Sequence, residues 1–275
     1  MTTSASHPRT ALHRYILLTA AVTFVLLLAG GLVTSTDSGL AVPDWPLSYG
    51  TWFPPMVGGI RYEHTHRMIA GAVGLLILGL AVWVGRTESR RWVRRLSLAA
   101  LAAVLVQALL GGLTVLLVLP APISIAHACL GPAVFCLVVC VAVATSPAWQ
   151  ETPVQLEDAW QPSLRRLSVA VAGLAAMQLL LGAVLRHTGM GVSAHILGAV
   201  LLLASVGMTA VRVKRTVGAK PLLGAMLRRL EILWTLQLVL GLVALRWRDA
   251  VGIATAHVGV GALFLAQSVV LAWQI

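Results

Sequence analysis

Long apolar runs separated by short polar segments dominate the pattern of this chain. Eight runs of roughly 17 to 23 residues cover positions 15–34, 66–85, 96–118, 124–145, 167–185, 193–211, 230–246 and 251–273. About 20 apolar residues are enough for a helix to cross a hydrocarbon core about 30 Å thick. Strands of a membrane barrel would alternate apolar and polar residues, which these runs do not. The pattern therefore predicts an all-α integral membrane protein with eight transmembrane helices.

Composition agrees with this prediction. The 275 residues are 59% hydrophobic and 11% charged, whereas soluble domains carry about 25% charged residues. The segment before the first run, MTTSASHPRTALHR, resembles the start of a secretion signal. The apolar run that follows is too long for a signal, and no convincing cleavage site of small residues follows it. We therefore expect this run to be retained as the first transmembrane helix.

The basic residues gather at alternate ends of the runs. With the N-terminus placed inside, 15 of the 20 Lys and Arg lie in inner segments; the outer ones are Arg61, Arg67, Arg186, Arg246 and Arg248. By the positive-inside rule both termini are expected in the cytoplasm. The net charge of +11 then reflects topology and contact with anionic membrane lipid, and no nucleic-acid partner is expected. The three cysteines all fall in the fourth run, where they are expected to be apolar filler.

The chain repeats itself in two halves. Gln107, Gly111 and His127 align with Gln237, Gly241 and His257 at an offset of 130 residues, and His66 aligns with His195 at 129. The Pro-rich segment between the halves places their boundary near 150, giving units 1–150 and 151–275. Because each half has four runs, the two are expected to be tandem, pseudo-symmetric four-helix bundles of the same orientation.

Four histidines stand at matching depths in the predicted bundles. His66, His127, His195 and His257 each lie within the first two turns of an even-numbered run, and all these runs begin on the outer side. A zinc site needs three or four protein ligands, which the sequence does not supply at this depth. Two imidazoles on opposite sides of a macrocycle suit haem iron in a bundle core. We therefore predict one bis-histidine haem site per half, with room for the ring from Gly71, Gly74, Gly131, Gly198, Gly259 and Gly261.

The two halves differ at these sites. Glu63 stands one turn before His66, whereas Val192 occupies the corresponding place before His195. The first half also carries a long outer loop, 35–63, which is rich in Pro, Gly and aromatic residues and suits a lid. Glu63 has two interpretations at this point: a reactive carboxylate beside a haem, or a residue paired with the helix dipole or with Arg61 or Arg67.

These motifs resemble those of the haem A synthase family over essentially the whole chain. Glu63-His64-Thr65-His66-Arg67 is similar to its E-x-x-H-R signature, and Ser38-Gly39-Leu40 with Asp44-Trp45-Pro46-Leu47 to its S-G-L…D-W-P-L loop. Ala126-His127, Ala256-His257 and Arg186-His187-Thr188 match its later histidine segments.

The resemblance implies an enzyme of the cell membrane that oxidises the C8 methyl of haem O to the formyl group of haem A, with water as oxygen donor. It implies that Glu63 is catalytic, that His66 and His127 ligate the substrate haem, and that His195 and His257 ligate a permanent haem b. The implied partners are haem O, with a haem O synthase as its candidate donor, and an unidentified electron acceptor; a homo-oligomer is the further candidate assembly. Arg67, Arg186, Arg246 and Arg248 are candidate contacts to haem propionates.

The sequence departs from the family at two points. Many members have a cysteine pair where Val42 and Ser48 stand, and often an arginine where Thr34 stands. A loop disulfide is therefore excluded at Val42 and Ser48. Two alternative functions stay open from the residues alone: a di-haem membrane cytochrome that passes electrons from quinol, and a haem transporter or chaperone.

Overall fold

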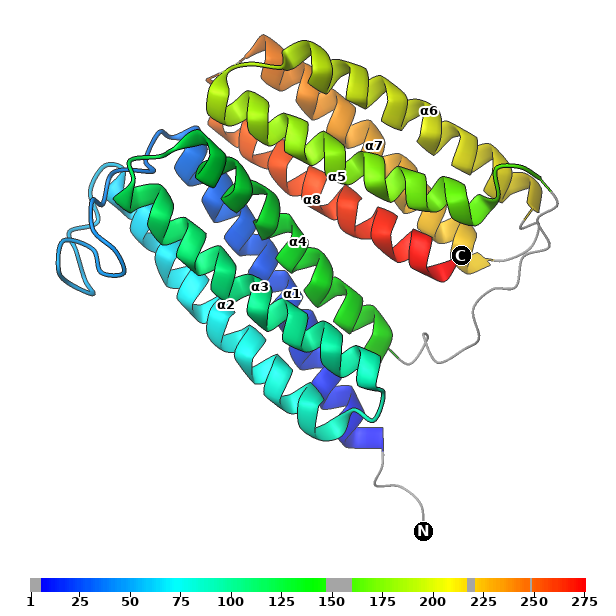
Figure 1. Ribbon diagram of the computed structural model, residues 1–275, viewed down its shortest axis with the longest axis horizontal. Helices are drawn as coiled ribbons and strands as arrows, with labels where there is room; N and C mark the ends of the chain where they lie inside the picture. Colours follow the sequence, from blue (N-terminus) through cyan, green and yellow to red (C-terminus); the bar gives the residue numbers. More distant parts are fainter. Residues whose placement is uncertain (1–5, 147–159, 217–220, 248) are drawn as a thin grey trace. The chain divides into compact units, whose positions relative to one another are not determined.

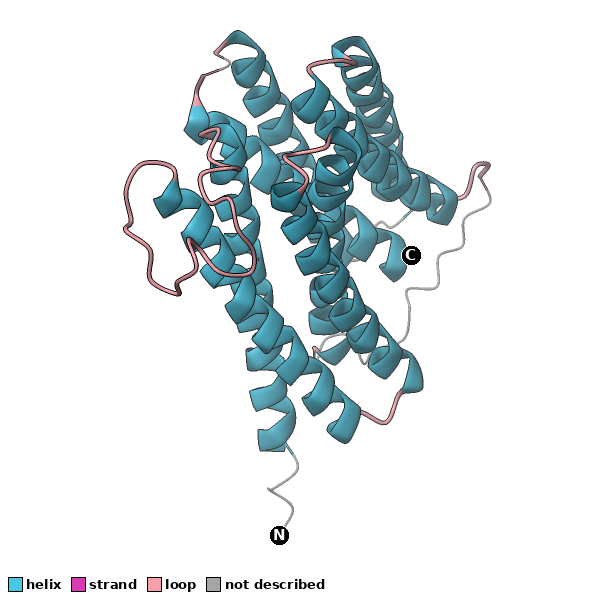
Figure 2. Cartoon of the chain, turned by 60° about the vertical axis from the view of Figure 1, so that its left-hand side comes forward, coloured by secondary structure: helices cyan, strands magenta, loops and turns pink. Residues whose placement is uncertain are grey.

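The described part of the chain is built from helices. The computed structural model describes residues 6–146, 160–216, 221–247 and 249–275, and every extended regular element among them is a helix (Figure 2). The helices are α1 (Ser6–Ser35), α2 (Ile60–Thr87), α3 (Arg91–Leu116), α4 (Ala121–Thr145), α5 (Leu164–Thr188), α6 (Val192–Thr216), α7 (Pro221–Arg246) and α8 (Val251–Gln274). The prediction of an all-α architecture with eight helices in these places is confirmed.

Seven of the described helices, α1 to α6 and α8, are long and apolar enough to cross a membrane. The eighth, α7, is as long as the others, but its apolar stretch is bounded by Arg229 and Glu231 before it and by Arg246 after it. A helix of 24 residues is about 36 Å long, which exceeds the hydrocarbon thickness. The cytoplasmic placement of the termini stays a prediction.

The surface of α2 shows why these helices suit lipid. Val73, Ile77 and Val84 lie on one face and are fully buried, with 0% of their surface exposed. Leu75 and Leu78 lie on the opposite face, and 71% and 45% of their surfaces are exposed. A helix that is apolar on its exposed face as well as on its buried face is typical of a membrane span.

The first unit contains α1 to α4. Each of these helices packs against two others, α1 against α2 and α4, and α3 against α2 and α4, which gives a four-helix bundle (Figure 1). The long segment 36–59 connects α1 to α2 at one end of this bundle, the end at which α2 and α4 begin. The cysteines Cys129, Cys136 and Cys140 are free thiols within α4. This bundle positions the site described below.

The second unit contains α5, α6 and α7, with α6 packed between its two chain neighbours. Residues 260–275 of the last helix belong to it as well, whereas 249–259 group with the first unit. The rings of Trp234 and Phe264 join α7 to α8 at a centroid distance of 5.4 Å. The predicted boundary between the two halves, near residue 150, lies outside the described residues.

Candidate functional site

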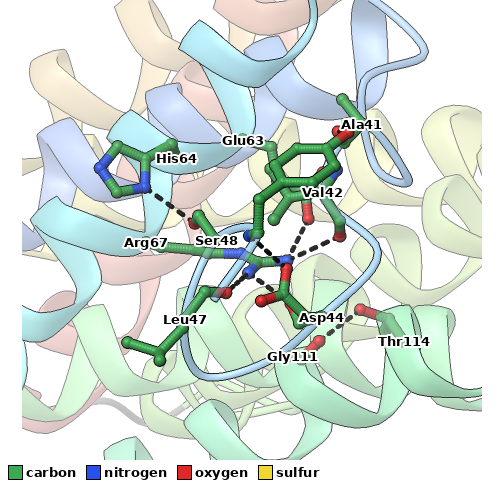
Figure 3. A network of polar contacts seen from close by, with 11 residues as sticks. Ala41, Val42, Asp44, Leu47, Ser48, Glu63, His64, Arg67, Gly111 and Thr114 are labelled. Atoms are coloured by element: carbon green, nitrogen blue, oxygen red, sulfur yellow. Dashed lines mark hydrogen bonds and ion pairs between the residues drawn. The ribbon is translucent and has the colours of Figure 1, made fainter. Parts of the chain in front are cut away.

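The first turn of α2 carries a buried carboxylate. Only 3% of the surface of Glu63 is exposed, and a buried charge has to be paired. Its Oε2 accepts a hydrogen bond from the backbone N–H of Val42 at 2.8 Å, and its Oε1 accepts one from Arg67 at 2.5 Å (Figure 3). Of the two interpretations of Glu63, pairing with Arg67 is thus present in the structure. Pairing leaves the carboxylate available for chemistry, because it places a defined acceptor one turn from His66.

The guanidinium of Arg67 holds the loop that precedes α2. One terminal nitrogen donates to the carbonyl oxygens of Asp44 at 2.6 Å and Leu47 at 2.7 Å. The other donates to the Val42 carbonyl at 3.1 Å and to Glu63. Both terminal nitrogens are therefore engaged by the loop and by the carboxylate (Figure 3). In this structure Arg67 anchors a lid, and a haem propionate would have to share it.

The loop also closes on itself around Asp44. This carboxylate accepts hydrogen bonds from the backbone N–H groups of Gly50 at 2.8 Å and Tyr49 at 2.7 Å. The Gly50 amide, the Tyr49 amide and the nearby Arg67 charge favour the ionised form and lower the pKa of Asp44 below its ordinary value. Gly50 has φ of 70°, a left-handed conformation that glycine adopts without strain. The turn 44–50 is thus a formed structure at neutral pH.

The two positions at which many family members carry cysteines are both tied to α2. Val42 is fully buried and both of its backbone polar groups are bonded, to Glu63 and to Arg67. The Ser48 hydroxyl lies 2.9 Å from Nδ1 of His64, and both side chains are buried. Hydrogen bonds to α2 therefore hold the loop at the places where those members carry their cysteine pair. They also give His64 a structural role that the sequence did not reveal.

The side chain of Trp45 brings the loop into contact with α3. A Cβ atom added at Gly112 would lie 2.7, 2.8 and 3.0 Å from three carbons of the Trp45 ring. The indole therefore lies directly on the backbone of α3, in contact that only glycine permits. The segment Asp44-Trp45-Pro46-Leu47 connects Arg67 on α2 to Gly112 on α3, and its role as a lid stays a prediction.

Replacing Gly112 with alanine is expected to displace Trp45 and loosen the loop. The indole is rigid and cannot yield by rotating one terminal group, and overpacking of this kind costs about 1–3 kcal/mol. We expect the loop to be cut by protease about tenfold faster, which a time course of limited proteolysis on the purified protein measures. Gly74→Ala is the matched control, because no described atom lies within 4 Å of its added methyl group. Equal cleavage of the two variants would contradict the contact.

His66 and His127 come together in the first unit. His66 lies in the second turn of α2 and His127 in the second turn of α4, and their imidazoles are close enough to interact electrostatically. Nδ1 of His127 donates to the backbone carbonyl of Gln107 at 3.2 Å, which orients the imidazole ring. Nδ1 of His66 is buried and makes no hydrogen bond within the described residues.

The donor set fits haem iron. Among the described residues no three His, Cys, Asp or Glu side chains gather at a point where they could hold a metal. Two imidazoles from opposite helices, one with its second nitrogen oriented by a carbonyl and one with an orphaned buried nitrogen, suit the two axial positions of a haem. The first unit thus contains the two histidines of the predicted haem site, which stays a prediction, and Glu63 stands one turn before His66.

The remaining predicted residues lie in or beside the second unit. His195 is in the first turn of α6, and His257 is in the second turn of α8, within the stretch grouped with the first unit; their pairing stays a prediction. His187 and the exposed Arg186 lie in the last turn of α5. Arg246 ends α7 in an exposed position. Arg248 lies outside the described residues.

The histidine rings contact glycines that sequence reasoning did not single out. Gly131 and Gly261, which follow two of the histidines, lie against glutamine side chains. The rings of His66, His127 and His195 instead contact glycines on the preceding helix: Gly30, Gly111 and Gly182. The alignment of Gly111 with Gly241 was a signal of this arrangement. Its meaning depends on which helix faces which, and a single sequence does not show that.

The family comparison covers this site. A family model described as COX15-CtaA, cytochrome oxidase assembly protein, matches residues 13–58 and 60–196. The match includes Glu63, His66, His127 and His195.

Curated relatives match shorter stretches. Heme A synthase of Bacillus pumilus is 38% identical over 108 residues, 38% of this chain and 35% of that protein. Heme A synthase of Exiguobacterium sibiricum is 47% identical over 70 residues, 23% of each chain. Protoheme IX farnesyltransferase of Halobacterium salinarum is 29% identical over 187 residues, 64% of this chain and 42% of that protein. The matched part of the chain spans 35% of the length of the Bacillus relative and 23% of the Exiguobacterium one.

Proposed function

Because the chain belongs to the COX15-CtaA family of cytochrome oxidase assembly proteins, we propose that it is a haem A synthase of the cell membrane. Its substrate is haem O, whose C8 methyl group it oxidises to the formyl group of haem A. The observation that carries the proposal is the buried Glu63 carboxylate one turn from His66, in a bundle where His66 and His127 come together. The curated relatives named heme A synthase support it.

The reaction has a simple balance. A methyl group and one water become a formyl group, four protons and four electrons. The four electrons leave to an external acceptor, so the enzyme is an oxidoreductase, and the oxygen comes from water. The four protons have to leave a site enclosed by helices and by the loop 36–59. Glu63 is the carboxylate at this place, and a positioned carboxylate acts as a general base by accepting such protons.

The residues divide the work between two haems. His66 and His127 hold the substrate haem, while His195 and His257 hold a resident haem b, which supplies electron transfer when bound. Arg186 and Arg246, both exposed at helix ends, are the proposed contacts to haem propionates, together with Arg248. Arg67 acts mainly by fixing the lid through the Asp44 and Leu47 carbonyls. Trp45, seated on Gly112, keeps the lid over the first site.

A haem O synthase is the proposed donor of the substrate. The matching protoheme IX farnesyltransferase shares similarity over 187 residues with this chain, which supports a close relation between the two activities. The exposed apolar faces, such as that of Leu75 on α2, contact membrane lipid or a second copy of the chain.

The function is tested by the product. The full chain is expressed with a haem O source, the pigments are extracted, and each haem is identified by mass. We expect haem A with the wild-type chain and none without it. Finding only haem B and unchanged haem O would contradict the proposal and favour a di-haem cytochrome or a haem carrier.

A further inference from the structure

The rings of three of the four histidines pack against a glycine of the neighbouring helix in the same way. A Cβ atom added at Gly30, Gly111 or Gly182 would lie 3.0, 3.0 and 3.1 Å from Cε1 of His66, His127 and His195 respectively. In each pair the glycine belongs to the helix that precedes the histidine in the chain. The recurrence of one contact in helix pairs α1–α2, α3–α4 and α5–α6 marks it as part of how the imidazoles are held.

A glutamine one turn before the glycine adds a second contact. Nε2 of Gln107 donates to the backbone carbonyl of His127 at 3.0 Å, and Nε2 of Gln178 donates to that of His195 at 2.8 Å. The backbone carbonyl of Gln107 also accepts a hydrogen bond from Nδ1 of His127 at 3.2 Å. Nε2 of Gln178 lies 3.1 Å from Nδ1 of His195. We call this glutamine, together with the carbonyl it binds, the brace. It fixes the helical turn that carries the imidazole.

In two of the helix pairs a glycine on the histidine's own helix lies against the glutamine. Gly131, four residues after His127, would place a Cβ 3.2 Å from Nε2 of Gln107. Gly261, four residues after His257, would place one 3.1 Å from Nε2 of Gln237. In α6 the residue at this offset from His195 is Ala199, so a glycine there accompanies the brace in two pairs and is not required for it. Gln237 occupies the same position beside α8 that Gln107 occupies beside α4, one turn before Gly241 as Gln107 is before Gly111.

The pair α1–α2 lacks the glutamine of the brace. Leu26 stands one turn before Gly30, and Ala70 stands four residues after His66. Leucine cannot donate a hydrogen bond to the His66 carbonyl. The Leu26 carbonyl faces the imidazole, yet Nδ1 of His66 makes no well-aligned hydrogen bond within the described part of the chain. His66 is thus seated on its glycine but is not fixed by a neighbouring amide.

From this difference we propose that the brace separates resident haem from exchangeable haem, and that unbraced His66 is the ligand that releases when haem enters and leaves the first site. The proposal rests on the proposed function, in which the first site takes substrate and gives up product while the second keeps its haem. A haem held by two imidazoles is released once one of them lets go. The turn that is held only by its own helix lets go first, whereas His195 is held by Gln178, and Gln237 stands on α7 at the position equivalent to Gln107.

The test moves the brace between sites and measures haem release without measuring catalysis. The full chain, loaded with haem b at both sites, is mixed with excess apomyoglobin as haem acceptor, and transfer is followed by absorbance. We expect a fast and a slow phase. Leu26→Gln with Ala70→Gly should slow the fast phase about fivefold, and Gln178→Leu should speed the slow phase about fivefold, the size of effect expected from one hydrogen bond. Leu26→Met is the matched control and should leave both phases unchanged.

The low-spin signal of each variant is recorded first, so that release is compared between chains that hold both haems. Unchanged rates in either Leu26→Gln/Ala70→Gly or Gln178→Leu, with both low-spin haems present, would overturn the proposal. Gln178→Leu is an independent arm if the double variant does not bind haem. The two proposals can fail separately. Altered haem release in variants of a chain that makes no haem A would contradict the synthase function and support the role of the brace. Haem A formation by a chain whose variants release haem at unaltered rates would support the synthase function and contradict the role of the brace.

Discussion

Glu63→Gln is expected to lower haem A formation by about 10²–10⁴-fold, the range lost when a positioned general base is removed. Glutamine has the shape of glutamate and its amide oxygen can still accept the hydrogen bond from the Val42 N–H. Haem binding should therefore be retained, because His66 and His127 are unchanged. The measurement is the mass and amount of each haem extracted from the purified variant. A chain that binds haem O but returns it unoxidised is the expected result.

Arg67→Gln distinguishes a catalytic role of Glu63 from a role as an anchor of the loop. This change removes the donors to the Asp44, Leu47 and Val42 carbonyls while Glu63 itself remains. We expect a loop that is cleaved faster by protease and a smaller loss of haem A, about tenfold, because each broken hydrogen bond costs about 0.5–1.5 kcal/mol. If Glu63→Gln and Arg67→Gln lower haem A equally and both expose the loop, the carboxylate is an anchor and the catalytic assignment is wrong.

The helices could be predicted because their apolar runs are long and uninterrupted. The ends could not: α1 begins at Ser6 and α7 at Pro221, each about nine residues before its predicted start. These added turns hold polar residues such as His13, Arg14, Arg228 and Arg229. A hydropathy pattern reports where hydrocarbon begins, whereas the backbone hydrogen bonds of a helix continue into the interface.

The site was predictable where side chains carry the chemistry. Glu63, His66 and His127 could be singled out from residue type and spacing, and the structure places all three in the first unit, on α2 and α4, while their roles stay predictions. The partners of Arg67 could not be found, because carbonyl oxygens belong to every residue and leave no pattern in the sequence. The same holds for the contact of Trp45 with Gly112 and for the glycine seats, since both depend on which helices face each other.

Replacing the histidines one at a time is expected to remove one haem at a time. His127→Ala deletes a ligand of the first site, so that haem content should fall from two to one per chain and haem A formation should drop at least about 100-fold, as expected when a substrate loses its positioning. His195→Ala should instead remove the resident haem b and leave the first site able to bind haem O without oxidising it. Haem per chain is measured by pigment extraction, and the surviving low-spin signal by electron paramagnetic resonance.

The controls are histidines outside the predicted pairs. His13 lies in α1 with Nδ1 3.4 Å from the Thr145 hydroxyl, and His187 lies in the last turn of α5. Alanine at either position should leave two haems per chain and both low-spin signals. If His66→Ala and His127→Ala removed different haems, or if His195→Ala and His127→Ala removed the same one, the assignment of two couples would be wrong. The sharper expectation is that His66→Ala and His127→Ala give the same residual spectrum, because a couple that shares one iron loses it whichever member is deleted.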